Sequence, residues 1–253
     1  MLDRLVRTVF GVLGVALVVG CVLRPSPGRD SAAPGSTEPA EPAAEPSADG
    51  DGWIALFDGV STSALRSYGG EEALQGWEVA DGSLRTVPGA GVDTISRETF
   101  IDFELEFRWR VSPGGNSGVI YRVAETGDPS WATGPEYQIL DNDEHPDGRD
   151  PLTSAASLYG LLPPDPSAAP RPVGEFNDGR IVVRDGQVEH WLNGVLAVRY
   201  QWAGPEVRQL IAGTKFRDLP GFMGQDQGHI VLQHHGEEVW LRDVRVRRLG
   251  SGD

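Results

Sequence analysis

The 253-residue chain has a single cysteine and no excess of positive charge, and both shortages limit what it can do. Because that cysteine, Cys21, lies near the N-terminus, the rest of the chain cannot form a disulfide, a thiolate metal site or a cysteine nucleophile. Its 37 Asp and Glu residues outnumber 22 Lys and Arg, for a formal net charge of −15. This excess of acid argues against binding nucleic acid or anionic lipid through a basic surface.

A hydrophobic run long enough to cross a bilayer is also absent. Val9–Gly20 is an apolar run of about twelve residues, short of the roughly twenty that a membrane-spanning helix needs. Arg4 and Arg7 precede it, as in a secretory signal peptide, and Val18-Val19-Gly20-Cys21 matches the bacterial lipobox. We predict a signal peptide at residues 1–20 and a lipid anchor on Cys21. A short membrane anchor and an ordinary secretory signal are the alternatives.

The segment after Cys21 is poor in aromatic and branched aliphatic side chains and consists mainly of Pro, Ala, Ser, Glu and Gly. It cannot bury enough apolar surface to offset the entropy lost on ordering. We predict a lipidated cysteine and linker at 21–51, a folded domain at 52–249 and a tail at 250–253. The predicted location is the cell envelope, outside the cytoplasm. Because Val22 rather than Asp follows the cysteine, this is the outer membrane or periplasmic side in a Gram-negative source.

Helical signals are scarce in the folded part. Ser63–Ala73 and Gly204–Ala212 come closest to an amphipathic helix, but both lack a continuous apolar stripe. Ile101–Val111 instead alternates apolar with charged residues, which predicts a long strand buried on one face. Three acidic residues of this strand, Asp102, Glu104 and Glu106, share the other face, which is expected to be a solvated outer face rather than part of a catalytic cleft.

Three pairs of turn-forming residues predict tight hairpins, and they are Asp81-Gly82, Asp185-Gly186 and Asn193-Gly194. Many short strands in about two hundred residues favour two packed antiparallel sheets over a barrel. No internal repeat predicts a propeller or a solenoid. The predicted fold is therefore all-β, a jelly-roll sandwich of two antiparallel sheets.

Several polar motifs follow one another along the folded part. They include Gly115-Asn116-Ser117-Gly118, Gly134-Pro135-Glu136-Tyr137-Gln138-Ile139-Leu140-Asp141, Ser157-Leu158-Tyr159-Gly160, Thr214-Lys215-Phe216, Gln233-His234-His235-Gly236 and Val239-Trp240-Leu241-Arg242. This ordered set resembles the 3-keto-disaccharide hydrolase domain family, from Trp53 to Leu249. The specificity lies in the order, because each motif alone is short.

The resemblance implies a concanavalin A-like jelly roll and a substrate class, glycosides whose glucosyl C3 has been oxidised to a ketone. Such a ketone acidifies the hydrogen on C2. A general base can then remove that hydrogen, an enolate forms, and the C1 substituent leaves by elimination with help from a general acid. Addition of water completes a net hydrolysis. This chemistry needs a base, an acid and a donor or cation at the enolate oxygen.

Glu136 and Asp141 are the candidate carboxylates, one as base and the other as acid or orienting group. Positions five apart on a regular strand point to opposite faces, so both reach one cleft only if a bulge intervenes or Asp141 lies past the strand end. The alternative for each is a solvated or salt-bridged surface acid.

His235 is the candidate histidine, as acid, base or metal ligand. The family usually reads Gln-Asp-His-Gly here, whereas this chain has His234 in place of the Asp, which removes a carboxylate that would orient His235. The alternative is a histidine that satisfies backbone groups at a strand end. Lys215 and Arg122 are candidates to hold the enolate oxygen or substrate hydroxyls, and a structural salt bridge is the alternative for either cation.

The remaining candidates for substrate binding follow from the same motifs. Arg242 shares its strand parity with Trp240, Val244 and Val246, which predicts that its side chain points inward to a carboxylate. The full set of predicted substrate-binding residues is Asn116, Arg122, Tyr137, Gln138, Tyr159, Gln233, Trp240 and Arg242.

No cofactor is required by the sequence, and a divalent cation is left open. Asp141-Asn142-Asp143-Glu144-His145, with Asp147 beyond, is rich in oxygen ligands but lacks the spacing of an EF-hand loop, so a solvated acidic loop is favoured and no metal ligand is assigned. Gly115-Asn116-Ser117-Gly118 is not a serine nucleophile elbow.

A non-catalytic, lectin-like carbohydrate-binding lipoprotein remains the alternative to an enzyme, because β-sandwich folds occur in both lectins and hydrolases. Trp131, Trp191, Trp202 and Trp240 would serve either by stacking on sugars. The sequence leaves the oligomeric state open.

Overall fold

The computed structural model describes residues 51–250 except 72 and 90, and all of these belong to one compact unit, Ala43–Asp253. The predicted signal peptide, Cys21, the linker up to residue 50 and tail residues 251–253 lie outside the described residues. Within the described part, no helix is long and apolar enough to cross a membrane.

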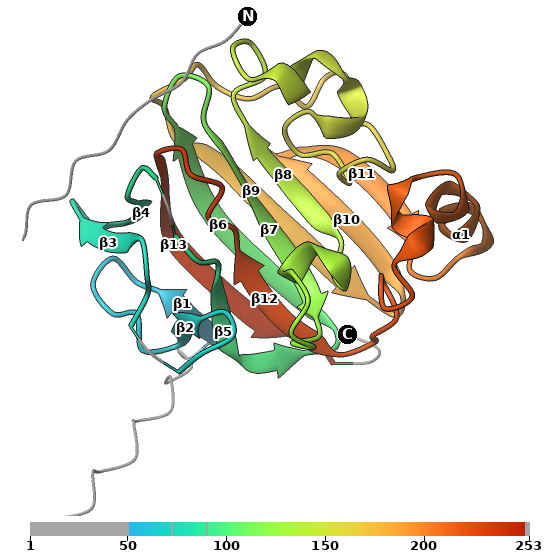
Figure 1. Ribbon diagram of the computed structural model, residues 1–253, viewed down its shortest axis with the longest axis horizontal. Coiled ribbons are helices and arrows are strands. Elements are labelled where there is room, and N and C mark those ends of the chain that lie inside the picture. Colours follow the sequence, from blue (N-terminus) through green and yellow to red (C-terminus); the bar gives the residue numbers. More distant parts are fainter. Residues whose placement is uncertain (1–50, 72, 90, 251–253) are drawn as a thin grey trace, which may run out of the picture. The chain divides into compact units, whose positions relative to one another are not determined.

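Two antiparallel sheets lie face to face (Figure 1). The larger has eight strands: β1 (Trp53–Phe57), β3 (Trp77–Ala80), β4 (Ser83–Thr86), β6 (Phe103–Val111), β9 (Asn177–Arg184), β10 (Gln187–Leu192), β11 (Val195–Gln201) and β13 (Val239–Arg248). The smaller has five, in the order β2 (Leu65–Ser67), β5 (Thr94–Phe100), β12 (Gly228–Leu232), β7 (Asn116–Val123) and β8 (Glu136–Leu140). The predicted all-β sandwich of two antiparallel sheets is confirmed.

All three predicted hairpins form. The residue pairs Asp81-Gly82, Asp185-Gly186 and Asn193-Gly194 have positive φ at both positions, between 49° and 82°. A positive φ at both central residues characterises the type I′ turn, whose twist matches that of the flanking strands. These turns join β3 to β4, β9 to β10 and β10 to β11.

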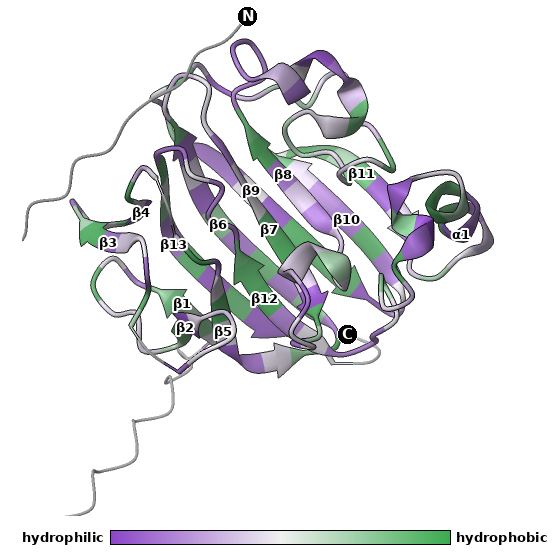
Figure 2. Ribbon diagram, in the orientation of Figure 1, coloured by the Kyte–Doolittle hydropathy of each residue, from purple (hydrophilic) through white to green (hydrophobic). Residues whose placement is uncertain are grey.

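Between the sheets lies the apolar core (Figure 2). The inward residues of β6, from Phe103 to Val111, are at most 4% exposed as predicted, whereas Ile101, which was expected to begin this strand, precedes it and is 52% exposed. A polar network is embedded in this core: the His190 Nδ1 contacts the Ala156 carbonyl oxygen, and its Nε2 lies 2.8 Å from the Tyr121 hydroxyl. Burial lowers the pKa of His190 to about 4, so the ring is neutral and accepts a hydrogen bond from Tyr121.

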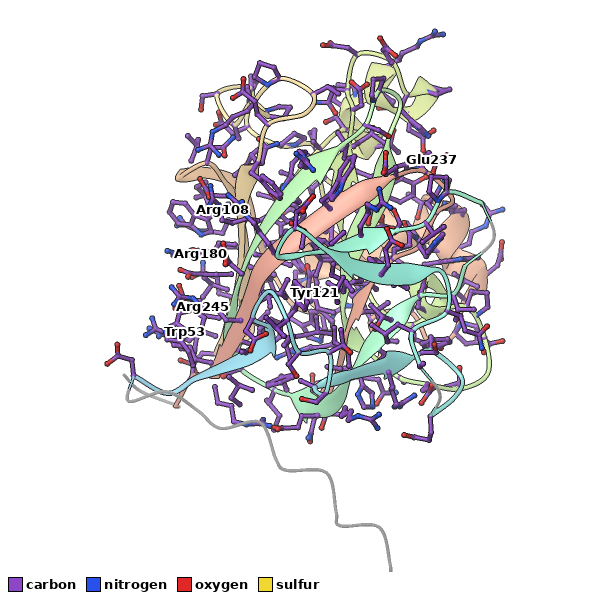
Figure 3. All side chains as sticks on the ribbon, turned by 90° about the vertical axis from the view of Figure 1, so that its left-hand side faces the viewer. Trp53, Arg108, Tyr121, Arg180, Glu237 and Arg245 are labelled. Atoms are coloured by element: carbon purple, nitrogen blue, oxygen red, sulfur yellow. The ribbon has the colours of Figure 1, made fainter. Side chains whose placement is uncertain are left out.

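The outer face of the larger sheet is covered by paired charges, which we call the arginine face. Glu104 is 2.5 Å from Arg247 and 3.3 Å from Arg180, and Glu106 is 2.7 Å from Arg245. Arg108, Arg180 and Arg245 project from this side in Figure 3, away from the core. The predicted outer acidic row is therefore present, but arginines rather than water cover much of it, and Glu104 is only 7% exposed.

A bulge in β13 reverses one prediction. Asp243 has a φ of 52°, and the register against β6 shifts between Arg242 and Arg245. Val239 and Leu241 face the core before the bulge, and Val244 and Val246 face it afterwards. Because one extra residue switches the alternation, Arg242 points outward with Trp240, and the prediction of an inward Arg242 is wrong.

Short helices lie at several places around the edge and outer face of the sandwich (Figure 1). The α-helix α1 (Pro205–Ala212) forms within the segment that was judged too weakly amphipathic for a helix, and it precedes the 3-10 turn η4 (Lys215–Asp218). The other 3-10 turns are η1 (Ser130–Ala132), η2 (Pro146–Arg149) and η3 (Pro151–Thr153). Residues from η1, η2 and η4 form part of the pocket described next.

Candidate active site

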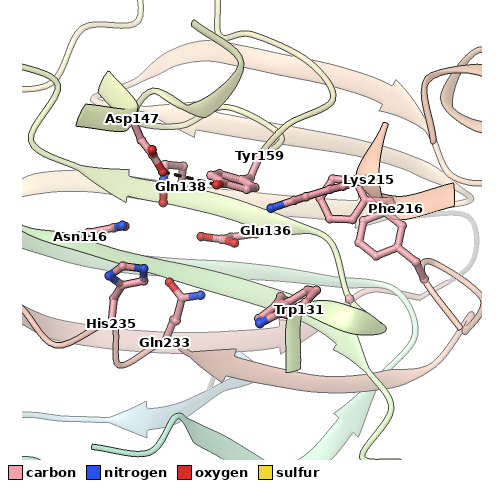
Figure 4. Close-up of a pocket in the computed structure, with 12 residues that line it drawn as sticks. Asn116, Trp131, Glu136, Gln138, Asp147, Tyr159, Lys215, Phe216, Gln233 and His235 are labelled. Atoms are coloured by element: carbon pink, nitrogen blue, oxygen red, sulfur yellow. Dashed lines mark hydrogen bonds between the residues drawn. The ribbon is translucent and has the colours of Figure 1, made fainter. Parts of the chain in front are cut away.

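A cavity of about 160 Å³ lies on the outer face of the smaller sheet. The alternation of β8 explains its position: the Tyr137 hydroxyl reaches between the sheets to the Trp191 carbonyl, so Glu136 and Gln138 face the other way. The residues that line the cavity are Asn116, Trp131, Gly134, Glu136, Gln138, Asp147, Tyr159, Lys215, Phe216, Phe222, Gln233 and His235 (Figure 4).

Glu136 lies at the centre of this pocket (Figure 4) and is 8% exposed. Its side chain lies across Gly118 of the neighbouring strand β7, where a Cβ atom would come within 2.3 Å of Oε1. Within the described residues, no donor forms a hydrogen bond with its carboxyl group. Burial raises the pKa of Glu136 to about 8, with a smaller opposing effect of Lys215. Such a carboxyl group exchanges protons near neutral pH, as acid–base catalysis requires.

Lys215 is the only lysine of the chain, and it points toward Glu136 (Figure 4). Thr214 precedes it and accepts a hydrogen bond from the Phe216 amide, which begins the turn η4. The ammonium lies 4.7 Å from the ring centre of Tyr159, 5.3 Å from Phe216 and 5.9 Å from Trp131. Because no described carboxylate forms an ion pair with it within 4.0 Å, this cation is available to an anionic oxygen of a ligand.

His235 reaches the pocket from the loop after β12. Its Nδ1 lies 3.0 Å from Oε2 of Glu237, so a carboxylate two residues further on contacts the ring. The His234 side chain turns elsewhere: its Nε2 contacts the Gly76 carbonyl oxygen, and its ring packs against Gly91 and edge-on to Trp77. The carboxylate absent at position 234 is thus replaced by Glu237.

Polar side chains complete the wall. Tyr159 donates a hydrogen bond to Asp147 over 3.4 Å, and burial raises the pKa of Tyr159 to about 12. The Gln138 amide nitrogen donates to the Thr153 carbonyl oxygen over 3.3 Å. The buried side-chain oxygen of Asn116 has no partner. An unpartnered acceptor on a pocket wall is suited to a ligand hydroxyl.

The structure brings together seven of the predicted site residues: Asn116, Glu136, Gln138, Tyr159, Lys215, Gln233 and His235. It places Asp141 elsewhere, past the end of β8, where the carboxylate accepts hydrogen bonds from the amides of Gly114, Asp143 and Glu144. These bonds hold the loop, so the geometry gives Asp141 no place at the pocket.

Four predicted binding residues also lie away from the pocket. Tyr137 is buried in the core. Arg122 is 3% exposed, donates to the Ile101 carbonyl oxygen and packs under Trp202. The other two, Trp240 and Arg242, lie on the arginine face because of the bulge.

Some pocket residues were missed or weakly signalled. Asp147 appeared only as part of an acidic loop and Phe216 only as the last residue of the Thr214-Lys215-Phe216 motif, while Phe222 carried no sequence signal. One sequence signal for Lys215 was not used. It is the single lysine of a chain whose 21 other Lys or Arg residues are all arginine, which suggests a specific role for its side chain. In the described part of the chain, no group of three or more His, Cys, Asp or Glu side chains could hold a metal ion.

A β-sandwich with a buried carboxyl group, a histidine and a cation in one pocket offers the groups that acid–base catalysis uses, as expected of carbohydrate-active enzymes with a jelly-roll fold. The chain belongs to the 3-keto-alpha-glucoside-1,2-lyase-like domain family, whose model matches residues 52–247. It is 34% identical over 232 residues to a 3-keto-disaccharide hydrolase of Bacteroides thetaiotaomicron, covering 79% of this chain and 80% of that protein.

Solved structures agree with this assignment. A candidate glycosyl hydrolase from Parabacteroides distasonis superposes with a TM-score of 0.74 at 27% identity, covering 79% of this chain and 95% of the other. A second one from the same organism, at 24% identity and a TM-score of 0.59, shares the fold. The predicted family and the prediction of an enzyme are confirmed, and the protein is a glycoside hydrolase rather than a non-catalytic lectin.

Proposed function

We propose that this enzyme cleaves the glycosidic bond of 3-keto-glycosides by elimination followed by hydration. The observation that carries the proposal is that Glu136 and Lys215 line the same pocket without forming an ion pair. Glu136 is a buried carboxyl group with a pKa of about 8, and Lys215 is a cation without a carboxylate partner among the described residues. The relative named a 3-keto-disaccharide hydrolase supports the substrate class.

In the first step, the Glu136 carboxylate takes the proton from C2 of the keto sugar. The electron pair of that C–H bond moves toward C3, and the developing negative charge on the C3 oxygen is stabilised by the Lys215 ammonium. Glu136 is suited to this step because a base is most effective when its pKa lies near the working pH.

In the second step, the electron pair returns to form a C1–C2 double bond while the bond from C1 to the leaving oxygen breaks. His235 donates a proton to that oxygen, and Glu237 holds the ring by its Nδ1. Water then adds its oxygen to C1 and gives its proton to His235, which lost one in the elimination. The C1–C2 π electrons move to the C3 oxygen and form the enolate again, and C2 then takes a proton from Glu136, whose carboxyl proton has exchanged with solvent. The products are 3-ketoglucose and the free alcohol. Asn116, Gln138 and Gln233 would bind the sugar hydroxyls.

The experiment is turnover of 3-keto-trehalose in D₂O, followed by NMR. Elimination and hydration predict one deuterium on C2 of the released 3-ketoglucose, in excess of the exchange in an enzyme-free control. Unoxidised trehalose is the matched substrate and should not react. Parallel reactions with a chelator test the open question of a divalent cation. Release of 3-ketoglucose without enzyme-dependent deuterium would contradict the elimination mechanism, and hydrolysis of trehalose at an equal rate would contradict the substrate class.

We further propose that the enzyme works at the cell envelope, anchored by a lipid on Cys21. The support is the signal-peptide pattern, the lipobox and the proline-rich segment that follows. Growth of an expressing strain with an alkyne-tagged fatty acid should label the wild-type protein and leave Cys21→Ala unlabelled. Equal labelling of both would contradict the anchor.

A further inference from the structure

Trp131 is conspicuous among the tryptophans of the described residues because its side chain is open to solvent. It is 41% exposed, whereas Trp53, Trp77, Trp109 and Trp202 are at most 9% exposed. It also lines the pocket (Figure 4). An exposed large aromatic ring beside a polar pocket is a common feature of ligand-binding surfaces.

Hydrogen bonds tie down the turn that carries this ring. Its neighbour Ser130 donates a hydrogen bond of 2.5 Å to Asp93, and the other oxygen of Asp93 accepts a hydrogen bond of 2.8 Å from the His234 amide. One carboxylate therefore ties the turn that carries Trp131 to the loop that carries His235. The backbones that carry the ring and the proposed general acid are thus joined through one side chain, as suits a subsite next to the cleaved bond.

The pocket is too small for a whole disaccharide. Its 160 Å³ fall below the roughly 300–1,000 Å³ of cavities that enclose complete drug-sized ligands. If the keto sugar fills the space around Glu136, the group attached to C1 must extend over the rim. Trp131 and His235 lie at the same side of the pocket in Figure 4, on either side of Gln233.

We propose that Trp131 is the platform of an aglycone subsite, which binds leaving groups with a flat apolar face, either a second hexose ring or an aromatic ring. This inference rests on the proposed function. Stacking on an indole ring contributes to binding through buried area and ring contacts. A methyl aglycone is too small to cover the platform, so Trp131 should matter only for the larger leaving groups.

The test compares three substrates that share one keto sugar: methyl 3-keto-α-glucoside, 3-keto-trehalose and p-nitrophenyl 3-keto-α-glucoside. For full-length Trp131→Ala, we expect kcat/KM to fall about tenfold on the two large substrates and less than about twofold on the methyl glucoside. Trp131→Phe should recover most of the loss. Trp240→Ala is the matched control, a tryptophan on the opposite side of the sandwich, and should leave the ratio between substrates unchanged.

Equal losses of kcat/KM on all three substrates would overturn the proposal, since they would mean that Trp131 supports Lys215 or the folded structure and does not bind the leaving group. No loss on any substrate would overturn it as well. Saturation-transfer NMR with p-nitrophenyl α-glucoside provides a readout without turnover: the wild type should saturate the aromatic protons, and Trp131→Ala should not. If the wild type turns over none of the keto substrates, the proposed function fails, while this binding measurement still decides for or against the subsite.

Discussion

The two outer faces of the sandwich use the same types of charged residue in opposite ways. On the arginine face, Glu104 and Glu106 lie within 2.7 Å of Arg247 and Arg245. In the pocket on the other sheet, Glu136 has no ion pair among the described residues, and burial raises its pKa to about 8. Pairing occupies the carboxylates of the arginine face with arginines, whereas burial without a partner makes the proton of Glu136 exchangeable near neutral pH.

Glu136→Gln should give the largest loss of activity of any substitution on either face. Loss of the base should lower kcat by a factor on the order of 10³, measured on 3-keto-trehalose. Glu106→Gln, which removes a paired carboxylate of the arginine face, should leave kcat unchanged. A comparable loss in the two variants would contradict the assignment of Glu136 as the base.

The stability of Glu136→Gln should also depend on pH. The folded-state pKa of Glu136, about 8, lies above its ordinary value of 4.5. The stability that the raised pKa of Glu136 contributes is therefore fully present below pH 4.5 and is lost as the pH rises through 8. The melting temperature of the variant relative to wild type should consequently increase between pH 5 and pH 9. A relative melting temperature that stays constant between pH 5 and pH 9 would contradict the raised pKa of Glu136.

Lys215→Met should give the next largest effect. Removal of the cation that faces the enolate oxygen should lower kcat by about 10²-fold. Because Lys215 lowers the pKa of Glu136, its loss should also move the rise of kcat/KM with pH, expected near pH 8 in the wild type, to higher pH. Arg217→Met, on the same turn but not among the residues that line the pocket, is the control. An unshifted profile would show that Lys215 does not act on Glu136.

Gly118→Ala should give a smaller loss by displacing the base. A Cβ atom at residue 118 would lie 2.3 Å from Oε1 of Glu136, so the carboxyl group must move. We expect kcat/KM to fall by roughly 10–100-fold, because small displacements of catalytic groups have costs of this size. Gly70→Ala is the matched control, since a Cβ atom there meets nothing within 4 Å. Full activity in Gly118→Ala would place the functional carboxylate elsewhere.

Glu237→Gln should give the smallest loss of activity, and it compares two neighbouring glutamates of one loop. The neighbouring Glu238 pairs with Arg85 at 2.7 Å, whereas Glu237 contacts His235. We expect Glu237→Gln to lower kcat about fivefold with KM unchanged, the signature of an interaction made in the transition state, and Glu238→Gln to leave both unchanged. The loss should be smaller on p-nitrophenyl 3-keto-α-glucoside, whose better leaving group needs less help from an acid.

Local patterns accounted for much of the fold. The alternation in β6 and the three turn pairs act through neighbours in the chain, and the structure contains both as predicted. The same logic failed in β13, because the bulge at Asp243 is an insertion relative to the partner strand β6. Parity counted along one strand cannot reveal a register shift that exists only between two strands.

The site divides in the same way. The ordered motifs led to Asn116, Glu136 and Gln138, whose shared parity on adjacent strands places them in one pocket. Asp141 belongs to the same motif as Glu136, yet its carboxylate is used by three backbone amides, and nothing in the residue types distinguishes the two acids.

The sequence by itself determined the class of fold, the family and the chemical groups available, since turns, alternation and motif order are properties of neighbouring residues. Only the tertiary structure decided which acid is paired and which is not. Glu104 and Glu136 are both buried glutamates, but β9 and β13 bring Arg180 and Arg247 to the first and only aromatic-bound Lys215 near the second. The distance between charges distant in sequence sets their ionisation, and that distance is a property of the packed sheets.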